Sequence, residues 1–242
     1  MGIYDETVET ARKMMILFFL IDTSGSMDGS KIGAVNQALE EVIPEIKRIS
    51  SENADAEIKI AAMTFSNEAR WLTADPQSAE TFYWNYVEAD GMTCFGEACR
   101  KLNEKLSRNA FMQSDCGAFA PAIFLMSDGV PNDEWKKPLA ELKANKWFKS
   151  AIKVAVAIGD DADKNMLSDF TGTGETVLSA HTPEALMKMI RFVSVTASQI
   201  GSKSSGIGGD EIDSIQTKQD SMAQQIQQCA ADLSDDEDKD TW

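Results

Sequence analysis

One acidic and two hydroxyl side chains stand at alternate positions directly after the most apolar stretch of the chain. In the segment FFLIDTSGSMDGSK, from Phe18 to Lys31, they are Asp22, Ser24 and Ser26. Hard divalent cations such as Mg²⁺ bind about six oxygen ligands and usually retain some water molecules. In a turning segment these side chains converge on one point, and serine hydroxyls bind a cation without adding charge. A further hydroxyl and a second acid would complete a metal site that still attracts an anionic oxygen.

The elements that must position these side chains are two apolar segments that each end in an acid. MMILFFLI, from Met14 to Ile21, precedes Asp22 and is far shorter than the roughly 20 residues that cross a bilayer. APAIFLMSD ends in Asp128. Ligands of open α/β sheets bind at the carboxyl ends of strands, near the point where the winding direction reverses. If the two strands are neighbours, both acids project into one crevice beside the loop ADGMTCFGEA.

Strand and helix signals alternate along the first 200 residues. Apolar residues recur at helical spacing in KIGAVNQALEEVIPEIKRI, FGEACRKLNEKL, KNMLSDF and PEALMKMIRFVSVTASQI, and Ser30 is the predicted N-cap of the first helix. The strands AEIKIAAMTFS and EARWLTAD flank Asn67 alone, which predicts an antiparallel hairpin with its second strand at an edge. IKVAVAIGDDAD and ETVLSA supply further strands. The pattern predicts an α/β fold: a doubly wound, mostly parallel six-stranded sheet with one antiparallel edge strand and helices on both faces.

Composition divides the chain near residue 200. With 242 residues, of which 43% are hydrophobic, the chain can bury a full core, and we expect one main domain over residues 1–200. The following GSKSSGIGGD is typical of a flexible linker. The apolar pattern of EIDSIQTKQDSMAQQIQQCAADL is too sparse for a core, and LSDDEDKDTW is strongly acidic. We therefore expect residues 201–242 to form a linker and an acidic tail.

The charge balance argues against nucleic acid and membranes as partners. The 23 basic and 39 acidic residues give a net charge of -16, which repels phosphate backbones and anionic lipids. The N-terminal residues lack the pattern of a secretory signal. The four cysteines form no CxxC pair and the chain has 1 histidine, so neither a zinc–thiolate site nor a disulfide framework is predicted. These features favour a cytoplasmic location.

Three short motifs resemble the parts of the metal-ion-dependent adhesion site of von Willebrand factor A-type (VWA) domains. They are DTSGSM, DGMT and LMSDGVPND, and they stand in the expected order. The resemblance implies a Rossmann-like VWA fold in which Ser24 and Ser26 bind the ion directly. It also implies that Thr93 binds directly or through water, and that Asp22 and Asp128 do so according to the state of the site. Mg²⁺ is the implied cofactor, with Mn²⁺ and Ca²⁺ as alternatives.

Within this family the chain resembles stand-alone bacterial proteins of the tellurite-resistance type, the TerY-like proteins. The resemblance rests on LIDTSGSM, GMTCFGEA, LMSDGVPND and HTPEALMKMI. It implies a regulatory or scaffold role in a stress or defence system, with a kinase or phosphatase of that system as a candidate partner. We expect a divalent-cation-dependent protein-binding module whose metal grips an Asp or Glu side chain of a partner.

A metal-dependent hydrolase is the alternative function. Phosphatases of the haloacid-dehalogenase type also place an aspartate after their first strand, but they need a second acid two residues later, where this chain has Ser24. A phosphate-binding loop in GSMDGSK is excluded because Ser30 precedes Lys31 and Ile32 follows it. No general base or nucleophile is evident beside the ion, so a binding module is favoured over an enzyme.

Several other residues have both a structural and a functional interpretation. His181 is expected simply to precede a helix cap at Thr182, and Asp160 and Asp161 are expected to be loop and cap residues or to edge the metal crevice. Cys94 is expected to be a small packing residue, with redox sensitivity as the alternative. The aromatic side chains of TFYWNYVEADGMT are expected to cover the core or to rim a binding surface.

Overall fold

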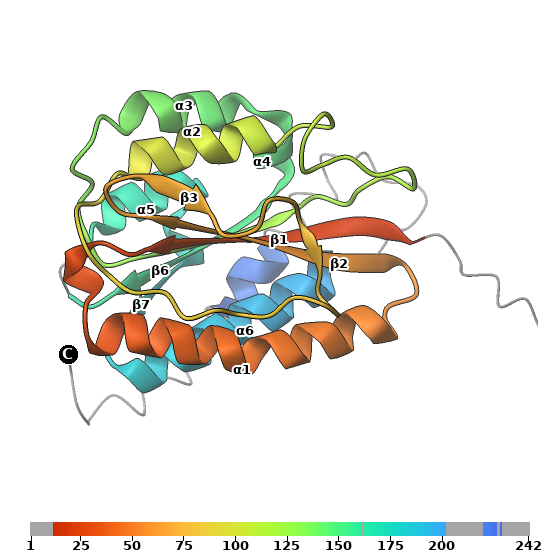
Figure 1. The fold of residues 1–242 in the computed structure, drawn as a ribbon, viewed down its shortest axis with the longest axis horizontal. Coiled ribbons are helices and arrows are strands. Elements are labelled where there is room, and N and C mark those ends of the chain that lie inside the picture. The colour runs from red at the N-terminus through yellow and green to blue at the C-terminus, as the bar shows by residue number, and fades with distance from the viewer. Residues whose placement is uncertain (1–11, 161, 202–219, 227, 229–242) are drawn as a thin grey trace, which may run out of the picture.

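A central sheet lies between two layers of helices (Figure 1). The structure, a computed structural model, describes residues 12–160, 162–201, 220–226 and 228. Its strands are β1 (Lys13–Asp22), β2 (Ala56–Phe65), β3 (Ala69–Trp71), β4 (Gln77–Ser78), β5 (Ala122–Ser127), β6 (Ile152–Ile158) and β7 (Val177–Ala180). Its helices are α1 (Ser30–Glu52), α2 (Phe95–Lys105), α3 (Lys136–Ala144), α4 (Lys146–Ser150), α5 (Lys164–Thr171) and α6 (Pro183–Gly201), with 3₁₀ turns η1 (Gly25–Met27) and η2 (Gly174–Thr176).

The sheet has the predicted mostly parallel, doubly wound topology. Its strand order is β3-β2-β1-β5-β6-β7, in which all neighbours except β3 and β2 are parallel. The two-residue strand β4 also pairs with β2 in the antiparallel sense, so the described residues contain seven strands rather than the six expected. The chain winds from β1 toward β2 and later from β5 toward β7, which places the switch point between β1 and β5.

The two faces of β1 belong to two separate apolar cores. Leu17 and Phe19 pack with residues of α1 and α6, whereas Ile16 and Phe18 pack with residues of α2, α3 and α5. All four side chains are 0% or 1% exposed. Strands of parallel sheets are covered by helices on both sides, and this explains the unbroken apolar run in the sequence.

Two local predictions on the helices were wrong or incomplete. The N-cap of α1 is Gly29, and Ser30 is the first helical residue. Gly29 adopts a φ of +81°, which glycine reaches far more easily than serine. The helices α3 and α4 had not been predicted, although their apolar side chains Leu139, Leu142 and Phe148 are buried.

Asn36 of α1 fixes an irregular segment over the edge of the sheet. Its Nδ2 atom donates to the carbonyl oxygen of Val87 at 2.8 Å, and its Oδ1 atom accepts from the backbone nitrogen of Val87 at 2.9 Å. The indole nitrogen of Trp84 donates to the same Oδ1 atom at 3.1 Å. A single buried amide therefore anchors the segment at Val87 and Trp84, in place of hydrogen bonds from a regular element.

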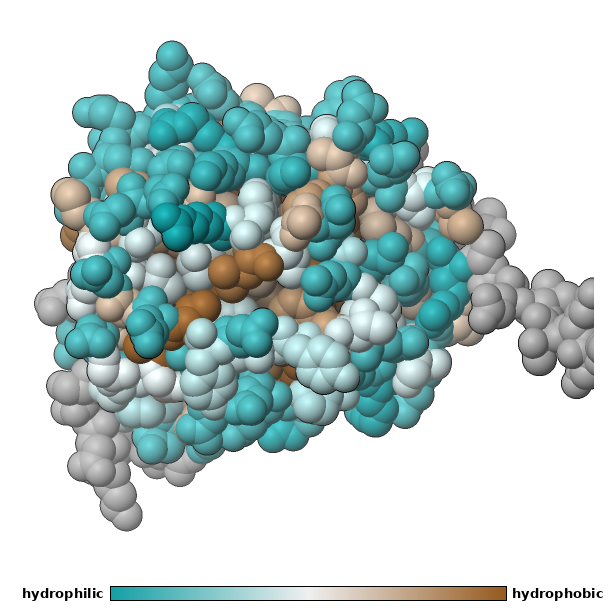
Figure 2. Space-filling view, in the orientation of Figure 1, coloured by the Kyte–Doolittle hydropathy of each residue, from teal (hydrophilic) through white to brown (hydrophobic). Residues whose placement is uncertain are grey.

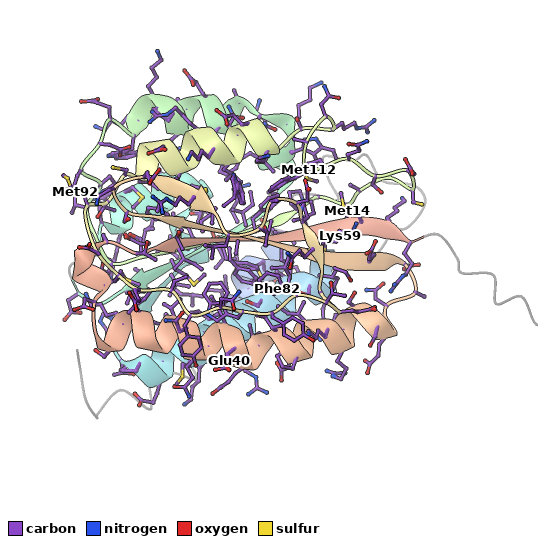
Figure 3. The ribbon with its side chains drawn as sticks, viewed as in Figure 1. Met14, Glu40, Lys59, Phe82, Met92 and Met112 are labelled. Carbon is purple, nitrogen blue, oxygen red and sulfur yellow. The ribbon has the colours of Figure 1, made fainter. Side chains whose placement is uncertain are left out.

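The aromatic side chains of this segment have divided roles. Phe82 is buried between the sheet and α1 (Figure 3), and Trp84 packs against the same core. Tyr83 and Tyr86 are 76% and 61% exposed. Tyr86 donates a hydrogen bond to Glu40 of α1, so the exposed tyrosines lie along this helix. The expectation that these aromatic side chains cover the core is confirmed for Phe82 and Trp84 and not for the two tyrosines.

Part of the C-terminal segment belongs to the core. Residues 220–226 are helical, and Met222, Ala223 and Ile226 are 0%, 6% and 3% exposed. Met222 and Ile226 join the same apolar core as α1 and α6. The expectation that this pattern is too sparse for a core was therefore wrong for these residues. The predicted linker and most of the acidic tail, residues 202–219 and 229–242, lie outside the described residues.

The visible surface is largely hydrophilic (Figure 2). Apolar side chains appear mainly in a band between α1 and the layer of α2, where the edge of the sheet faces the viewer. Among the described helices, none has the length and apolar character needed to cross a membrane. Cys94, Cys99 and Cys116 are free thiols, and Cys229 lies outside the described residues.

Candidate metal centre

Two buried acids stand at the carboxyl ends of neighbouring strands. Asp22 is the last residue of β1 and Asp128 directly follows β5, and they are 0% and 2% exposed. The two strands run parallel, with Ile21 opposite Met126. The sheet therefore brings both acids to the same end of the switch point, as the sequence predicts. In Figure 3 this end is marked by Met92, and Met14 marks the opposite end of β1.

The loop that carries Thr93 is joined to the turn after β1. The backbone nitrogen of Gly25 donates to the carbonyl oxygen of Gly91 at 3.0 Å. Gly91 has a φ of +88°, and a Cβ atom at this position would lie 2.4 Å from Nδ2 of Asn67. Only glycine fits both the backbone conformation and the space. The close approach of the two glycines holds the threonine loop against the serine turn.

The hydroxyls of the serine turn reach Asp128. The Oγ atoms of Ser24 and Ser26 lie 3.1 Å apart, and the Ser26 hydroxyl donates to Oδ1 of Asp128 at 2.7 Å. Ser24 is buried, whereas Ser26 is exposed. One edge of this group therefore faces solvent and is open to a ligand.

Oxygen atoms of Thr93, Ser26 and Asp22 lie around one point, the position that a Cβ atom of Gly129 would occupy. A Cβ atom on this glycine would lie 3.4 Å from Oγ1 of Thr93, 3.6 Å from Oγ of Ser26 and 3.9 Å from Oδ2 of Asp22. The adjacent pocket has a volume of about 360 Å³ and is lined by Ser24, Ser26, Gly91, Thr93, Asp128, Gly129, Val130 and Asn132. The structure thus brings together all five residues that the sequence predicts for the site: four of them line the pocket, and Asp22 is buried beside them.

Asp22 lies in an environment that disfavours its negative charge. Burial raises the pKa of the Asp22 carboxyl, and the charge of Asp128 raises it further. Hydrogen bonds from the Ser127 hydroxyl at 2.6 Å and from the Ser24 backbone nitrogen at 2.9 Å act in the opposite direction. Two buried acids at one point favour a cation between them, because a positive charge stabilises both carboxylates.

A lysine side chain already supplies positive charge to one of these acids. Nζ of Lys31, in the first turn of α1, lies 2.5 Å from Oδ2 of Asp128. The lysine side chain is 19% exposed and the aspartate side chain 1%. In the sequence, Lys31 stands out only as part of a segment that fails the pattern of a phosphate-binding loop, so its contact with Asp128 had not been predicted.

The donor set matches the preferences of a hard divalent cation. Three hydroxyl oxygens and two carboxylates provide oxygen ligands alone, as Mg²⁺, Mn²⁺ and Ca²⁺ prefer. Across the described part of the chain, no three or more His, Cys, Asp and Glu side chains gather where they could hold a metal. The candidate site instead combines three hydroxyl groups with two carboxylates, a set of oxygen donors that suits a hard cation.

The family model for the von Willebrand factor type A domain matches residues 17–192. This range contains both acids and all three hydroxyl residues of the site. The chain belongs to the VWA domain family. The predicted Rossmann-like VWA fold is confirmed by this match and by the sheet topology.

Solved VWA structures share the fold at low sequence identity. A von Willebrand factor type A protein from Catenulispora acidiphila aligns with a TM-score of 0.58 at 16% identity, over 77% of this chain and 43% of its own. The ArnB paralog VWA2 from Sulfolobus acidocaldarius aligns with a TM-score of 0.54 at 18% identity, over 75% and 45%. Proximal thread matrix protein 1 from the mussel byssus, in a structure with a zinc-occupied MIDAS motif, aligns with a TM-score of 0.55 at 15% identity. The alignment covers 76% of this chain and 49% of the mussel protein.

These relatives are longer proteins than the VWA chain described here. The chain spans about half or less of each of their lengths, so the likeness concerns the domain and its fold. No curated protein matches the chain in sequence.

The motif LMSDGVPND also holds the threonine loop of the VWA site in place, through Asn132 and Asp133, whose roles had not been predicted. The backbone nitrogen of Thr93 donates to Oδ1 of Asn132, and the nitrogen of Asn132 donates to the carbonyl oxygen of Thr93, both at 2.9 Å. The carboxylate of Asp133 accepts from the nitrogens of Gly96 and Glu97 at the start of α2. Both side chains belong to the quoted motif LMSDGVPND, which was the available signal.

Other polar residues considered from the sequence lie outside this group. Nδ1 of His181 lies 2.6 Å from Oδ1 of Asp160, and Thr182 caps the next helix by accepting from the nitrogen of Ala185 at 3.1 Å. Asp160 lies in the turn after β6, which confirms its expected place in a loop. The N-cap of α5 is Asp163, so the expectation that this acidic pair supplies the cap was wrong. Asp161 lies outside the described residues. The pKa of the Cys94 thiol is raised, mainly by burial. A raised pKa disfavours the reactive thiolate form.

Proposed function

We propose that this VWA domain binds a divalent cation, Mg²⁺, and uses it to hold an acidic side chain of a partner protein. The proposed ligands are Asp22, Ser24, Ser26, Thr93 and Asp128. The observation that carries the proposal is that oxygens of Thr93, Ser26 and Asp22 lie around the Cβ position of Gly129. Ser24 and Asp128 both contact the hydroxyl of Ser26, which is exposed, whereas the two acids are buried. Because the two carboxylates only balance the charge of the ion, a partner carboxylate remains an attractive further ligand.

The proposed roles differ between the buried and the exposed ligands. Ser24 and Ser26 would bind the ion directly through neutral oxygens. Asp22 and Asp128 would bind it directly or through water and supply most of the electrostatic attraction. Thr93 would bind from the loop opposite the serines. The pocket beside them, with Val130 and Asn132 in its walls, leaves space for the side chain of a partner.

The identity of the metal rests on the donor chemistry. Oxygen ligands and the expected retention of water favour Mg²⁺, with Mn²⁺ and Ca²⁺ as alternatives. The zinc-occupied motif of the mussel protein supports a divalent ion in a VWA site of this kind. Titration with each ion in turn would rank their affinities.

A binding role is proposed in preference to hydrolysis. The Ser, Thr and Asp side chains that line the pocket are all proposed metal ligands, and the described lining residues include no separate His, Cys, Tyr or Glu as a base or nucleophile. His181 is engaged with Asp160. The purified protein should therefore show no metal-dependent phosphatase or nucleotidase turnover above that of a Ser24→Ala variant. Robust turnover that is lost on this substitution would favour the hydrolase instead.

The biological setting is proposed from the motif resemblance. The TerY-like motifs support a regulatory or scaffold role in a cytoplasmic bacterial stress or defence system, with a kinase or phosphatase as the partner. The net charge of -16 argues against nucleic acid and anionic membranes as the bound surface. The free thiols of Cys94, Cys99 and Cys116 are compatible with a reducing compartment.

A capture experiment with two matched variants tests the proposed function. The tagged protein should retain a partner from lysate of its native host in Mg²⁺, and should lose it in a chelator or when Asp22→Asn is used as bait. Asp28→Asn removes an exposed carboxylate from the same turn and should capture as the wild type does. A glutamate-containing peptide in excess should release the partner. Equal capture in chelator and in Mg²⁺ would contradict the proposal.

A further inference from the structure

Lys31 stands where helix electrostatics disfavour a cation. It is the second residue of α1, and the unpaired backbone N–H groups of a helix N-terminus carry partial positive charge. An ammonium group in this turn is repelled unless an acid compensates it. The compensating acid is Asp128, whose Oδ2 atom is 2.5 Å from Nζ.

The contact engages the second oxygen of Asp128, so that both carboxylate oxygens have a partner. Its Oδ1 atom accepts a hydrogen bond from Ser26 at 2.7 Å, and its Oδ2 atom contacts Lys31. A carboxylate that is 1% exposed is destabilised without a counter-charge, and here the lysine provides it. The same carboxylate is a proposed ligand of the divalent ion.

We propose that Lys31 is a resident counter-ion that competes with the divalent cation for Asp128. The inference rests on the proposed function, because it takes Asp128 as a metal ligand. When the metal takes over the negative charge, the ammonium group faces both the ion and the N-terminus of α1. Its flexible four-carbon stem is partly exposed and allows the group to move into solvent. Metal binding therefore includes the loss of an ion pair, which lowers the metal affinity of the site.

This exchange has a functional consequence. A site that is neutralised internally stays folded without metal and binds the ion only weakly. A partner carboxylate that adds a ligand to the ion would then favour the metal-bound state, so metal and partner would bind cooperatively. Lys31 would set how strongly the two events depend on each other.

Two substitutions separate the charge of Lys31 from its bulk. Lys31→Met keeps the stem and removes the charge, and should bind Mg²⁺ about tenfold more tightly in calorimetry because the competing cation is gone. Without metal the same variant should unfold at a temperature lower by about 5 °C, since Asp128 then lacks its counter-charge. Lys31→Arg keeps the charge and should stay within about threefold of the wild-type affinity. General damage to the fold would not raise affinity.

The outcomes distinguish this inference from the proposed function. Equal or weaker Mg²⁺ affinity in Lys31→Met than in the wild type would overturn the competition while leaving the metal site in place. Absence of Mg²⁺ binding in the wild type and in both variants would contradict the proposed function and this inference with it. If Lys31→Met fails to fold, Lys31→Gln serves as the uncharged variant with the same expected gain in affinity.

Discussion

Asn in place of Asp22 should weaken Mg²⁺ binding at least about 100-fold. Loss of outer-shell partners already lowers metal affinity by about 10- to 100-fold, and Asp22 is proposed to face the ion itself. The substitution removes one of the two negative charges that attract the cation and keeps the shape of the side chain. Isothermal titration calorimetry of the wild type and the variant measures the change.

The choice of Asn protects the fold during this test. Asp22 accepts hydrogen bonds from the Ser127 hydroxyl and the Ser24 nitrogen, and Ala would leave both donors unpaired. Asp128→Asn should cause a similar loss of affinity, and Asp28→Asn, in the same turn but exposed, should cause none. Circular dichroism should show an intact fold in all three variants. Wild-type affinity in both Asp22→Asn and Asp128→Asn would refute the assignment of the site.

Ala in place of Met222 should lower the free energy of unfolding by about 3 kcal/mol. Met222 is 0% exposed and joins the core formed with α1 and α6, and truncation of a buried Met to Ala costs about 2–5 kcal/mol. Denaturant unfolding followed by circular dichroism measures the loss. The result bears on whether the domain ends near residue 200 or includes the helical residues 220–226.

Gln225 provides the matched control for this helix. Its side chain is exposed, so Gln225→Ala should change the free energy of unfolding by less than about 0.5 kcal/mol. Metal affinity should be unchanged in both variants, because the segment does not line the pocket. Wild-type stability in Met222→Ala would mean that residues 220–226 contribute nothing to the core in solution.

The fold could be predicted where the sequence pattern is long and uniform. The apolar run from Met14 to Ile21 indicates a strand covered on both faces. The short connection around Asn67 predicts a hairpin, and in the structure residues 66–68 join the antiparallel strands β2 and β3. The helical residues 220–226 escaped prediction because their apolar side chains are few and are buried in a core shared with the sheet, α1 and α6. Their placement depends on contacts between segments that are distant in the sequence.

The composition of the candidate site could be predicted because its parts are short motifs, two at strand ends and one in the loop before α2. A parallel sheet brings the end of β1 beside the end of β5, so Asp22 and Asp128 follow from topology alone. The contact between Lys31 and Asp128 joins residues 97 positions apart and follows from the position of α1 over the strand ends. The buried Asn36, which anchors Val87 and Trp84, likewise has no signal in a local pattern.

A crystal structure with Mn²⁺ tests the central claim most directly, because anomalous scattering locates this ion independently of the protein. We expect one strong anomalous peak beside Gly129, with the Oγ atoms of Ser24 and Ser26 bound directly to the ion and the carboxylates of Asp22 and Asp128 bound directly or through water. The Lys31 ammonium group should have moved away from Asp128. A fully occupied peak elsewhere, or none beside these residues at saturating Mn²⁺, would contradict the account.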